Sequence, residues 1–132
     1  MAMSAPPPKI DQMVTWVYTD DLPGTADFYA QTLGLEIVLD QGACRIYRVS
    51  QSAFLGVCQT RPGRYMEPKG VVLTLVSPDV DGWYTRLKQL GVHLEAPPVR
   101  SEQFNVYCFF ARDPNGYLVE FQSFLDPAWP AA

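Results

Sequence analysis

The sequence contains one structural pattern twice, and this repeat limits the folds that the chain can adopt. In the first half, an alternating run at residues 14–19 precedes apolar residues at helical spacing over 22–33. In the second half, a similar run at 72–76 precedes a second helical stripe over 80–90. A glycine follows each stripe, and glycine suits the left-handed backbone that ends many helices. The sequence therefore predicts two copies of a unit that begins with a strand and a helix.

Short alternating runs, separated by turn residues, follow each predicted helix. These predicted strands cover residues 36–39, 44–49 and 52–58 in the first half, and 93–95, 106–111 and 117–123 in the second. Each half is therefore predicted to be a βαβββ module, and such a module cannot bury its apolar face alone. We expect an α+β fold in which two βαβββ modules form an open, cupped mixed sheet with the helices outside.

The two predicted modules fit within a single domain. With 132 residues the chain has the length of one domain, which we place at 11–124. The modules are expected at 11–58 and 71–124, and the linker at 59–70 is rich in proline, glycine and charged residues. Residues 1–10 are predicted to be a flexible tail, and residues 125–132 a second tail.

Composition excludes several classes of partner. The net charge is −4 and no basic cluster occurs, so nucleic acid is not an expected partner. No apolar run approaches the ~20 residues that span a bilayer, and the first nine residues lack the apolar core of a signal peptide. Cys44, Cys58 and Cys108 form no CxxC motif. We expect them to be reduced thiols in the core of a cytoplasmic protein that binds neither nucleic acid nor membrane.

The segment 113–121, with the sequence DPNGYLVEF, predicts a tight turn followed by a strand that carries a carboxylate. Pro114 fixes φ at the second position of the turn. In the following strand, Glu120 lies between Leu118 and Gln122 on one face. A carboxylate in the middle of a strand is uncommon unless that face is wet or the group binds something. Glu120 is therefore a candidate functional residue.

This hairpin, together with the repeated βαβββ module, resembles the vicinal oxygen chelate superfamily. That superfamily includes glyoxalases, bleomycin-resistance proteins and extradiol dioxygenases, and the resemblance covers residues 11–124. It implies a ligand-binding cup in the sheet. It also implies a homodimer with two sites, because linkers in this family often let two chains exchange halves. In the metalloenzymes of the family, the glutamate that matches Glu120 is a metal ligand.

The resemblance places metal ligands on the first and last strand of each module. In this sequence the four positions hold Val14, Gly56, Val72 and Glu120. Divalent metals need imidazole, thiolate or carboxylate donors, and only the last of the four supplies one. We therefore expect no metal and no other cofactor. The single histidine, His93, falls on a strand that supplies no ligand in the family, and we expect it to be structural or to donate a hydrogen bond into the cup.

Alternation along the predicted strands indicates which side chains line the cup. The predicted ligand-binding residues are Val14, Trp16, Tyr18, Phe54, Val72, Thr74, Leu118, Glu120 and Gln122. This lining is apolar and aromatic with a few polar groups, which is the usual composition of a small-molecule pocket. The alternative interpretation is that the aromatic residues simply fill the cup as core.

Glu120 has two interpretations. In the functional one it is a general base or an anchor for a cationic ligand, so it is the one candidate catalytic residue. In the structural one it is held across the sheet by a backbone amide or by an arginine, for which Arg45, Arg48 and Arg112 are candidates.

The predicted function is metal-independent binding of a small organic molecule in the cup, in the manner of a resistance or sequestration protein. Two alternatives stay open. One is an enzyme, either a lyase or isomerase that uses Glu120 as a base, or a dioxygenase-type enzyme in which Glu120 is the sole remaining metal ligand. The other is a structural or partner-binding module. We expect a symmetric homodimer with each cup built across or beside the two-fold axis.

Overall fold

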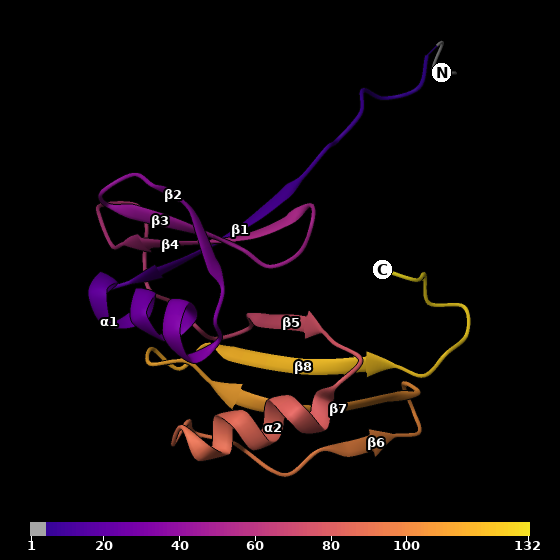
Figure 1. Cartoon of the computed structure of the whole chain (residues 1–132). Coiled ribbons are helices and arrows are strands. Elements are labelled where there is room, and N and C mark those ends of the chain that lie inside the picture. Colours follow the sequence, from indigo (N-terminus) through magenta and orange to yellow (C-terminus); the bar gives the residue numbers. More distant parts are fainter. Residues whose placement is uncertain (1–4) are drawn as a thin grey trace.

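The computed structural model describes residues 5–132 and contains two four-stranded sheets, each accompanied by a helix (Figure 1). The first module consists of β1 (Met13–Thr19), α1 (Leu22–Asp27), η1 (Phe28–Thr32), β2 (Glu36–Asp40), β3 (Cys44–Arg48) and β4 (Ala53–Gln59). The second consists of β5 (Val72–Val76), α2 (Val80–Gln89), β6 (Val99–Ser101), β7 (Val106–Arg112) and β8 (Leu118–Phe124). The α+β fold with two βαβββ modules is confirmed.

The two modules share one topology and one register. Their strand orders are β1-β4-β3-β2 and β5-β8-β7-β6, and in each the first and last strands of the module pair in parallel. Trp16 lies opposite Gly56 in the first module, and Thr74 lies opposite Glu120 in the second. Gly56 and Glu120 therefore occupy equivalent positions. The hydrogen-bonded strands form two separate sheets rather than one continuous sheet.

Two predicted elements differ from those observed. The first helix does not run regularly to Leu33, because α1 ends at Asp27 and continues as the π-helical turn η1, in which Leu33 N donates to Phe28 O. The predicted strand at 93–95 is only a single bridge, between Leu94 and Ala111. The strand β6 begins instead at Val99, directly after two prolines that have no N–H to donate to a ladder.

The expectation of three reduced thiols is wrong for two of them. Cys44 and Cys58 lie directly opposite each other on β3 and β4, with their Cα atoms 4.1 Å apart, and they form a disulfide. Because the two cysteines lie directly opposite each other on neighbouring strands, their Cβ atoms are close. Their separation of 14 residues along the chain does not by itself show that they are paired in this way. Cys108 is a free, buried thiol, as a core cysteine would be.

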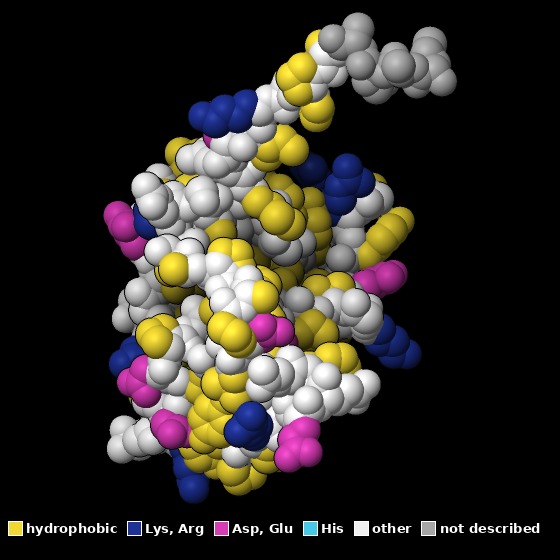
Figure 2. All heavy atoms as spheres, turned by 90° about the vertical axis from the view of Figure 1, so that its right-hand side faces the viewer, with side chains coloured by type: hydrophobic (Ala, Val, Ile, Leu, Met, Phe, Trp, Pro, Cys, Tyr) yellow, Lys and Arg dark blue, Asp and Glu magenta, His cyan; other side chains and the backbone are white. Residues whose placement is uncertain are grey.

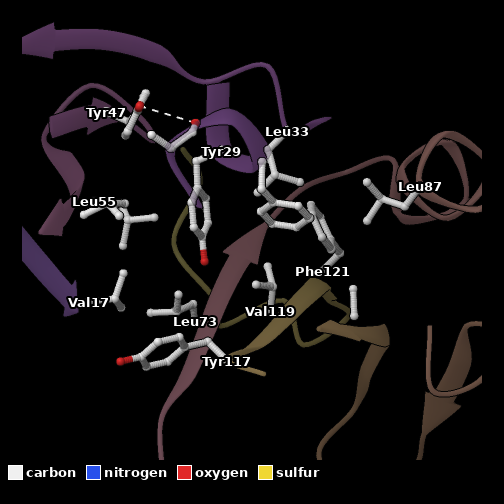
Figure 3. Packing of buried hydrophobic residues seen from close by; sticks show 14 of the residues in the cluster. Val17, Tyr29, Leu33, Tyr47, Leu55, Leu73, Leu87, Tyr117, Val119 and Phe121 are labelled. Carbon is white, nitrogen blue, oxygen red and sulfur yellow. Dashed lines mark hydrogen bonds between the residues drawn. The ribbon is translucent and has the colours of Figure 1, made fainter. Parts of the chain in front are cut away.

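One apolar core joins the two modules on the helix side of the sheets (Figure 3). Val17 and Leu55 contribute to it from the first module, and Leu73, Val119 and Phe121 contribute from the second. These residues alternate along their strands with the predicted cup residues. Burial of one face therefore leaves the other face of each sheet turned away from the core. Among the described residues, no helix is long and apolar enough to cross a membrane.

The hairpin before β8 is the polar joint between the modules. Asp113 is only 5% exposed, and its Oδ1 accepts hydrogen bonds from its own hairpin, from Asn115 N at 2.8 Å and Tyr117 N at 2.9 Å. Its Oδ2 accepts a hydrogen bond from the hydroxyl of Tyr29 in the first module, at 2.8 Å. Burial raises the pKa of the Asp113 carboxyl, while the hydrogen bonds that it accepts act in the opposite direction. Burial, and then the neighbouring carboxylate, raise the pKa of Tyr29 well above its usual value.

Asn115 extends this joint into the first module. Its side-chain amide donates to Thr25 Oγ1 at 2.9 Å and accepts from Thr19 Oγ1 at 2.9 Å, and both threonines are fully buried. The Tyr117 hydroxyl donates to the carbonyl of Tyr18 at 3.1 Å. The hairpin thus fixes how the second module sits against β1 and α1.

Replacing Asp113 with alanine is expected to lower the free energy of unfolding by about 3 kcal/mol, because it leaves several buried donors without an acceptor. Asp113→Asn keeps the shape and one acceptor oxygen, so its loss should be about a third as large. Urea unfolding at neutral pH measures both values. Equal stabilities for the alanine variant and the unmodified protein would contradict the proposed joint.

Candidate functional site

The faces of the sheets that are turned away from the core carry the predicted cup residues. In β1, Val17 and Thr19 are buried, whereas Val14 is 36% exposed and Trp16 is 43% exposed. In β5, Leu73 is buried and Val72 is 49% exposed. Figure 2 shows one face of the molecule on which hydrophobic side chains gather in a hollow between the upper and lower parts. The predicted alternation is therefore confirmed on both edge strands.

The predicted site residues form two groups of cross-strand neighbours, one on each sheet. The pairs in the first module are Val14 with Phe54 and Trp16 with Gly56, followed by Tyr18 with Cys58. The pairs in the second module are Val72 with Leu118, Thr74 with Glu120, and Val76 with Gln122. Gln122 is the least accessible of the predicted residues, at 9% exposed, so it contributes less surface to a ligand than the sequence suggested.

Glu120 is a half-buried carboxylate whose hydrogen-bond partner is a threonine on the neighbouring strand. The Thr74 hydroxyl donates to Glu120 Oε1 at 2.7 Å. Across the other edge, Glu120 lies opposite Phe110 of β7, so it shares a face with Cys108, two residues along that strand. Burial, and then the neighbouring Glu120 carboxylate, raise the pKa of the Cys108 thiol. The thiol is therefore protonated at neutral pH and is not a nucleophile in the resting protein.

The alternative in which an arginine holds Glu120 is not found among the described residues. Arg112 Nη2 lies 2.7 Å from an oxygen of Glu95. The remaining two candidates, Arg45 and Arg48, have their carboxylate partners within the first module, on β2. Each of the three guanidinium groups thus has an acidic partner other than Glu120. The carboxylate instead belongs to a small polar group with Thr74 and the thiol of Cys108.

The indole of Trp16 fills the position that is equivalent to Glu120 in the first module. Gly56 is buried, and a Cβ at this position would overlap the six-membered ring of Trp16. Glycine therefore allows the indole to approach the backbone of β4 closely. A longer side chain at residue 56 requires the indole to move, so the first module cannot supply a donor here without rearranging its aromatic surface.

The donor set of this site does not suit a transition metal. Val14 and Val72 have aliphatic side chains, and Gly56 has none. Among residues 5–132, no group of three or more histidine, cysteine, aspartate or glutamate side chains comes close enough to hold a metal ion. His93 is exposed, and its carbonyl accepts a hydrogen bond from Arg112 N at 3.0 Å. Glu120 is thus the single carboxylate of the predicted quartet.

Two surface hollows lie away from these residues. One, of about 270 Å³, lies between α1 and the β2–β3 hairpin and includes Arg45 and Tyr47 in its walls. The other, of about 530 Å³, lies in the linker and includes Arg61 and Tyr65. Neither was predicted, because each depends on how a loop or helix packs rather than on alternation in a strand.

Sequence reasoning also omitted three aromatic residues, of which Phe110 lies opposite Glu120. Phe124 continues the row formed by Glu120 and Gln122, so strand alternation would have included it if β8 had been extended by one residue. Trp129 lies in the segment that was predicted to be a tail, and its ring stacks on that of Phe124.

Comparison with known proteins places these features in a family. A family model described as the Glyoxalase/Bleomycin resistance protein/Dioxygenase superfamily matches residues 9–121. A lactoylglutathione lyase from Agrobacterium tumefaciens has a similar solved structure, with 27% sequence identity and a TM-score of 0.71, and the match covers 89% of this chain and 95% of that one. A search of curated proteins found no match.

Two more solved structures share the fold at lower identity. A glyoxalase/bleomycin resistance protein/dioxygenase from Nocardioides is 21% identical, with a TM-score of 0.72, over 98% of this chain and 92% of that one. An integron cassette protein from the mobile metagenome of V. cholerae is 19% identical, with a TM-score of 0.69, over 91% and 99% of the two chains.

Gly56→Ala is expected to destabilise the protein by about 2 kcal/mol, because the added methyl group overlaps the Trp16 indole. In a Trp16→Ala background the same change should cost much less, since the obstructing ring is gone. Urea unfolding of the four proteins in this double-mutant cycle measures the coupling between the two positions. Additive effects would show that the indole does not depend on glycine at residue 56.

Proposed function

Because the chain belongs to the glyoxalase/bleomycin resistance protein/dioxygenase superfamily, we propose that it binds a small organic molecule on its cup faces without a metal ion. The observation that carries this proposal is the indole of Trp16 over Gly56. At this position the first module presents an aromatic surface, whereas the equivalent position of the second module presents the carboxylate of Glu120. The two modules together supply an apolar surface and one polar group, the combination that small-molecule sites use.

The chemistry of the donors supports metal independence. A cation bound at Glu120 would find one carboxylate and the hydroxyl of Thr74, which already donates to that carboxylate. The neighbouring thiol of Cys108 has a raised pKa, which disfavours the thiolate form that binds metals. Catalytic zinc sites use three protein ligands, and aliphatic side chains such as those of Val14 and Val72 have no lone pair to offer. Binding energy therefore has to come from apolar contact and from hydrogen bonds to Glu120.

The ligand suggested by this surface is planar and apolar, with a hydrogen-bond donor or a positive charge at one end. Trp16 supplies aromatic contact area. Phe54 adds the part of its ring that is not covered by the Arg48 guanidinium, which lies 5.0 Å from the ring centre. Glu120 can accept a hydrogen bond from a cationic or neutral donor, and such charge-assisted bonds are among the stronger ones.

A second candidate is a lyase or isomerase in which Glu120 removes a proton as a general base. The similarity to a lactoylglutathione lyase supports this class of reaction. The Glu120 carboxylate lies on an accessible face of the sheet and has one oxygen that is not used by Thr74, as a base requires. This candidate predicts turnover of substrate that is lost in Glu120→Gln.

The binding proposal is tested with 2-(aminomethyl)anthracene, a planar aromatic molecule with a cationic ammonium at one end, and with neutral 2-methylanthracene as the matched probe. Glu120→Gln should weaken binding of the cation about tenfold, the effect of one charge-assisted hydrogen bond, and should leave binding of 2-methylanthracene nearly unchanged. Glu102→Gln, which changes the same charge at an exposed turn, serves as the control variant. Fluorescence titration measures the Kd values. Equal effects of the two substitutions, or binding that is abolished by EDTA, would contradict the proposal.

We also propose that the protein is a homodimer in which the exposed cup faces of the two chains meet and hold the ligand between them. Val72 and Val76 are 49% and 53% exposed on the cup face of β5, and Trp16 is 43% exposed on that of β1. In a dimer with two-fold symmetry, the partner chain would cover the exposed residues of β1 and of β5 at the same time. Light scattering at micromolar concentration should therefore give about twice the chain mass of 14.8 kDa.

The dimer should dissociate in Val72→Glu, because a charge would be buried at the interface. Leu90→Glu places the same charge at a similarly exposed site at the end of α2, on the helix side, and should leave the mass unchanged. A monomer mass for the unmodified protein would exclude the proposed assembly.

A further inference from the structure

The C-terminal segment after β8 is held by its own turn. Leu125 N donates to Asn105 O at 3.0 Å, which fixes the start of the segment against the loop before β7. The carboxylate of Asp126 accepts from Ala128 N at 2.9 Å, and its carbonyl accepts from Trp129 N at 3.1 Å. Such local bonds from an aspartate are typical of a tight turn. In Figure 1 the segment curls back from the end of β8 toward the level of the first module.

This turn places the indole of Trp129 on the ring of Phe124. The ring centroids are 3.7 Å apart, and the planes differ by 11°, so the two rings are stacked face to face. Phe124 lies opposite Val106 of β7, and it is two residues along β8 from Gln122 and four from Glu120. It therefore belongs to the same face of the sheet as Glu120. The stack extends that face beyond the end of the strand.

The other side of the Trp129 indole is accessible. The residue is 49% exposed, although Phe124 covers one face of its ring. An aromatic ring that is held on one side and open on the other is a preorganised stacking surface, because little further ordering is needed when a planar molecule binds. Along β8, Glu120 and Phe124 are four residues apart, which corresponds to about 13 Å.

We propose that Trp129 is a ligand-contacting residue that stacks on the planar part of the molecule whose polar end is held by Glu120. The inference rests on the proposed binding function and narrows the ligand class. A molecule that meets both residues needs an extended aromatic system with its donor at one end, rather than a compact aliphatic body. Trp129 then selects ligands by planarity and length, and Glu120 selects them by charge.

The test measures binding of 2-(aminomethyl)anthracene, whose ammonium lies at one end of a planar aromatic system, to Trp129→Ala, Trp129→Phe and Leu125→Ala in the full chain. Trp129→Ala should weaken binding about fivefold, within the range measured for aromatic pairs, and Trp129→Phe should retain most of the affinity. Leu125 is the matched control, because it lies in the same segment, is 41% exposed and takes no part in the stack. Its replacement should leave the Kd unchanged.

The outcomes separate this inference from the proposed function. If Glu120→Gln weakens binding of 2-(aminomethyl)anthracene and Trp129→Ala does not, the proposed binding site at Glu120 is supported and the role of Trp129 is overturned. If Trp129→Ala lowers the free energy of unfolding but leaves the Kd unchanged, the indole only covers Phe124, and the inference also fails. If the unmodified protein does not bind the probe, the proposed function fails and the inference fails with it.

Discussion

A buried carboxylate between two packed modules sets the geometry of the whole molecule. Asp113 accepts hydrogen bonds from its own hairpin and from Tyr29 of the other module, and the apolar core surrounds this contact. Because a buried charge without these donors would be costly, the hydrogen bonds and the docking of the modules depend on each other. The relative orientation of the two cup faces follows from this contact.

The same contact explains why the sequence of the hairpin indicates the fold but does not indicate the function. Asp113 and Asn115 are the residues of the turn that face the first module, and both are used for docking. Glu120 lies further along, on the opposite side of the sheet from the core, where docking places no demand on it. The docking of the two modules therefore explains Asp113 and Asn115 of the turn, but it does not explain the carboxylate of Glu120.

Most of the architecture could be predicted because it depends on periodicity within short segments. The buried Val17 and the exposed Trp16 follow from alternation alone. What could not be predicted depends on residues that become neighbours only through strand pairing or loop packing. The Cys44–Cys58 disulfide, the hydrogen bond from Thr74 to Glu120 and the stack of Trp129 on Phe124 are of this kind.

The shared register of the two modules has a consequence for the orientation in which a ligand can bind. Trp16 and Gly56 in one module occupy the places of Thr74 and Glu120 in the other, so two equal scaffolds present unequal chemistry. A ligand that contacted both modules would meet an apolar aromatic surface on one and a hydrogen-bond acceptor on the other. Such a ligand would bind in one orientation, because the reverse orientation would place its polar group against the indole of Trp16 without a hydrogen-bond partner.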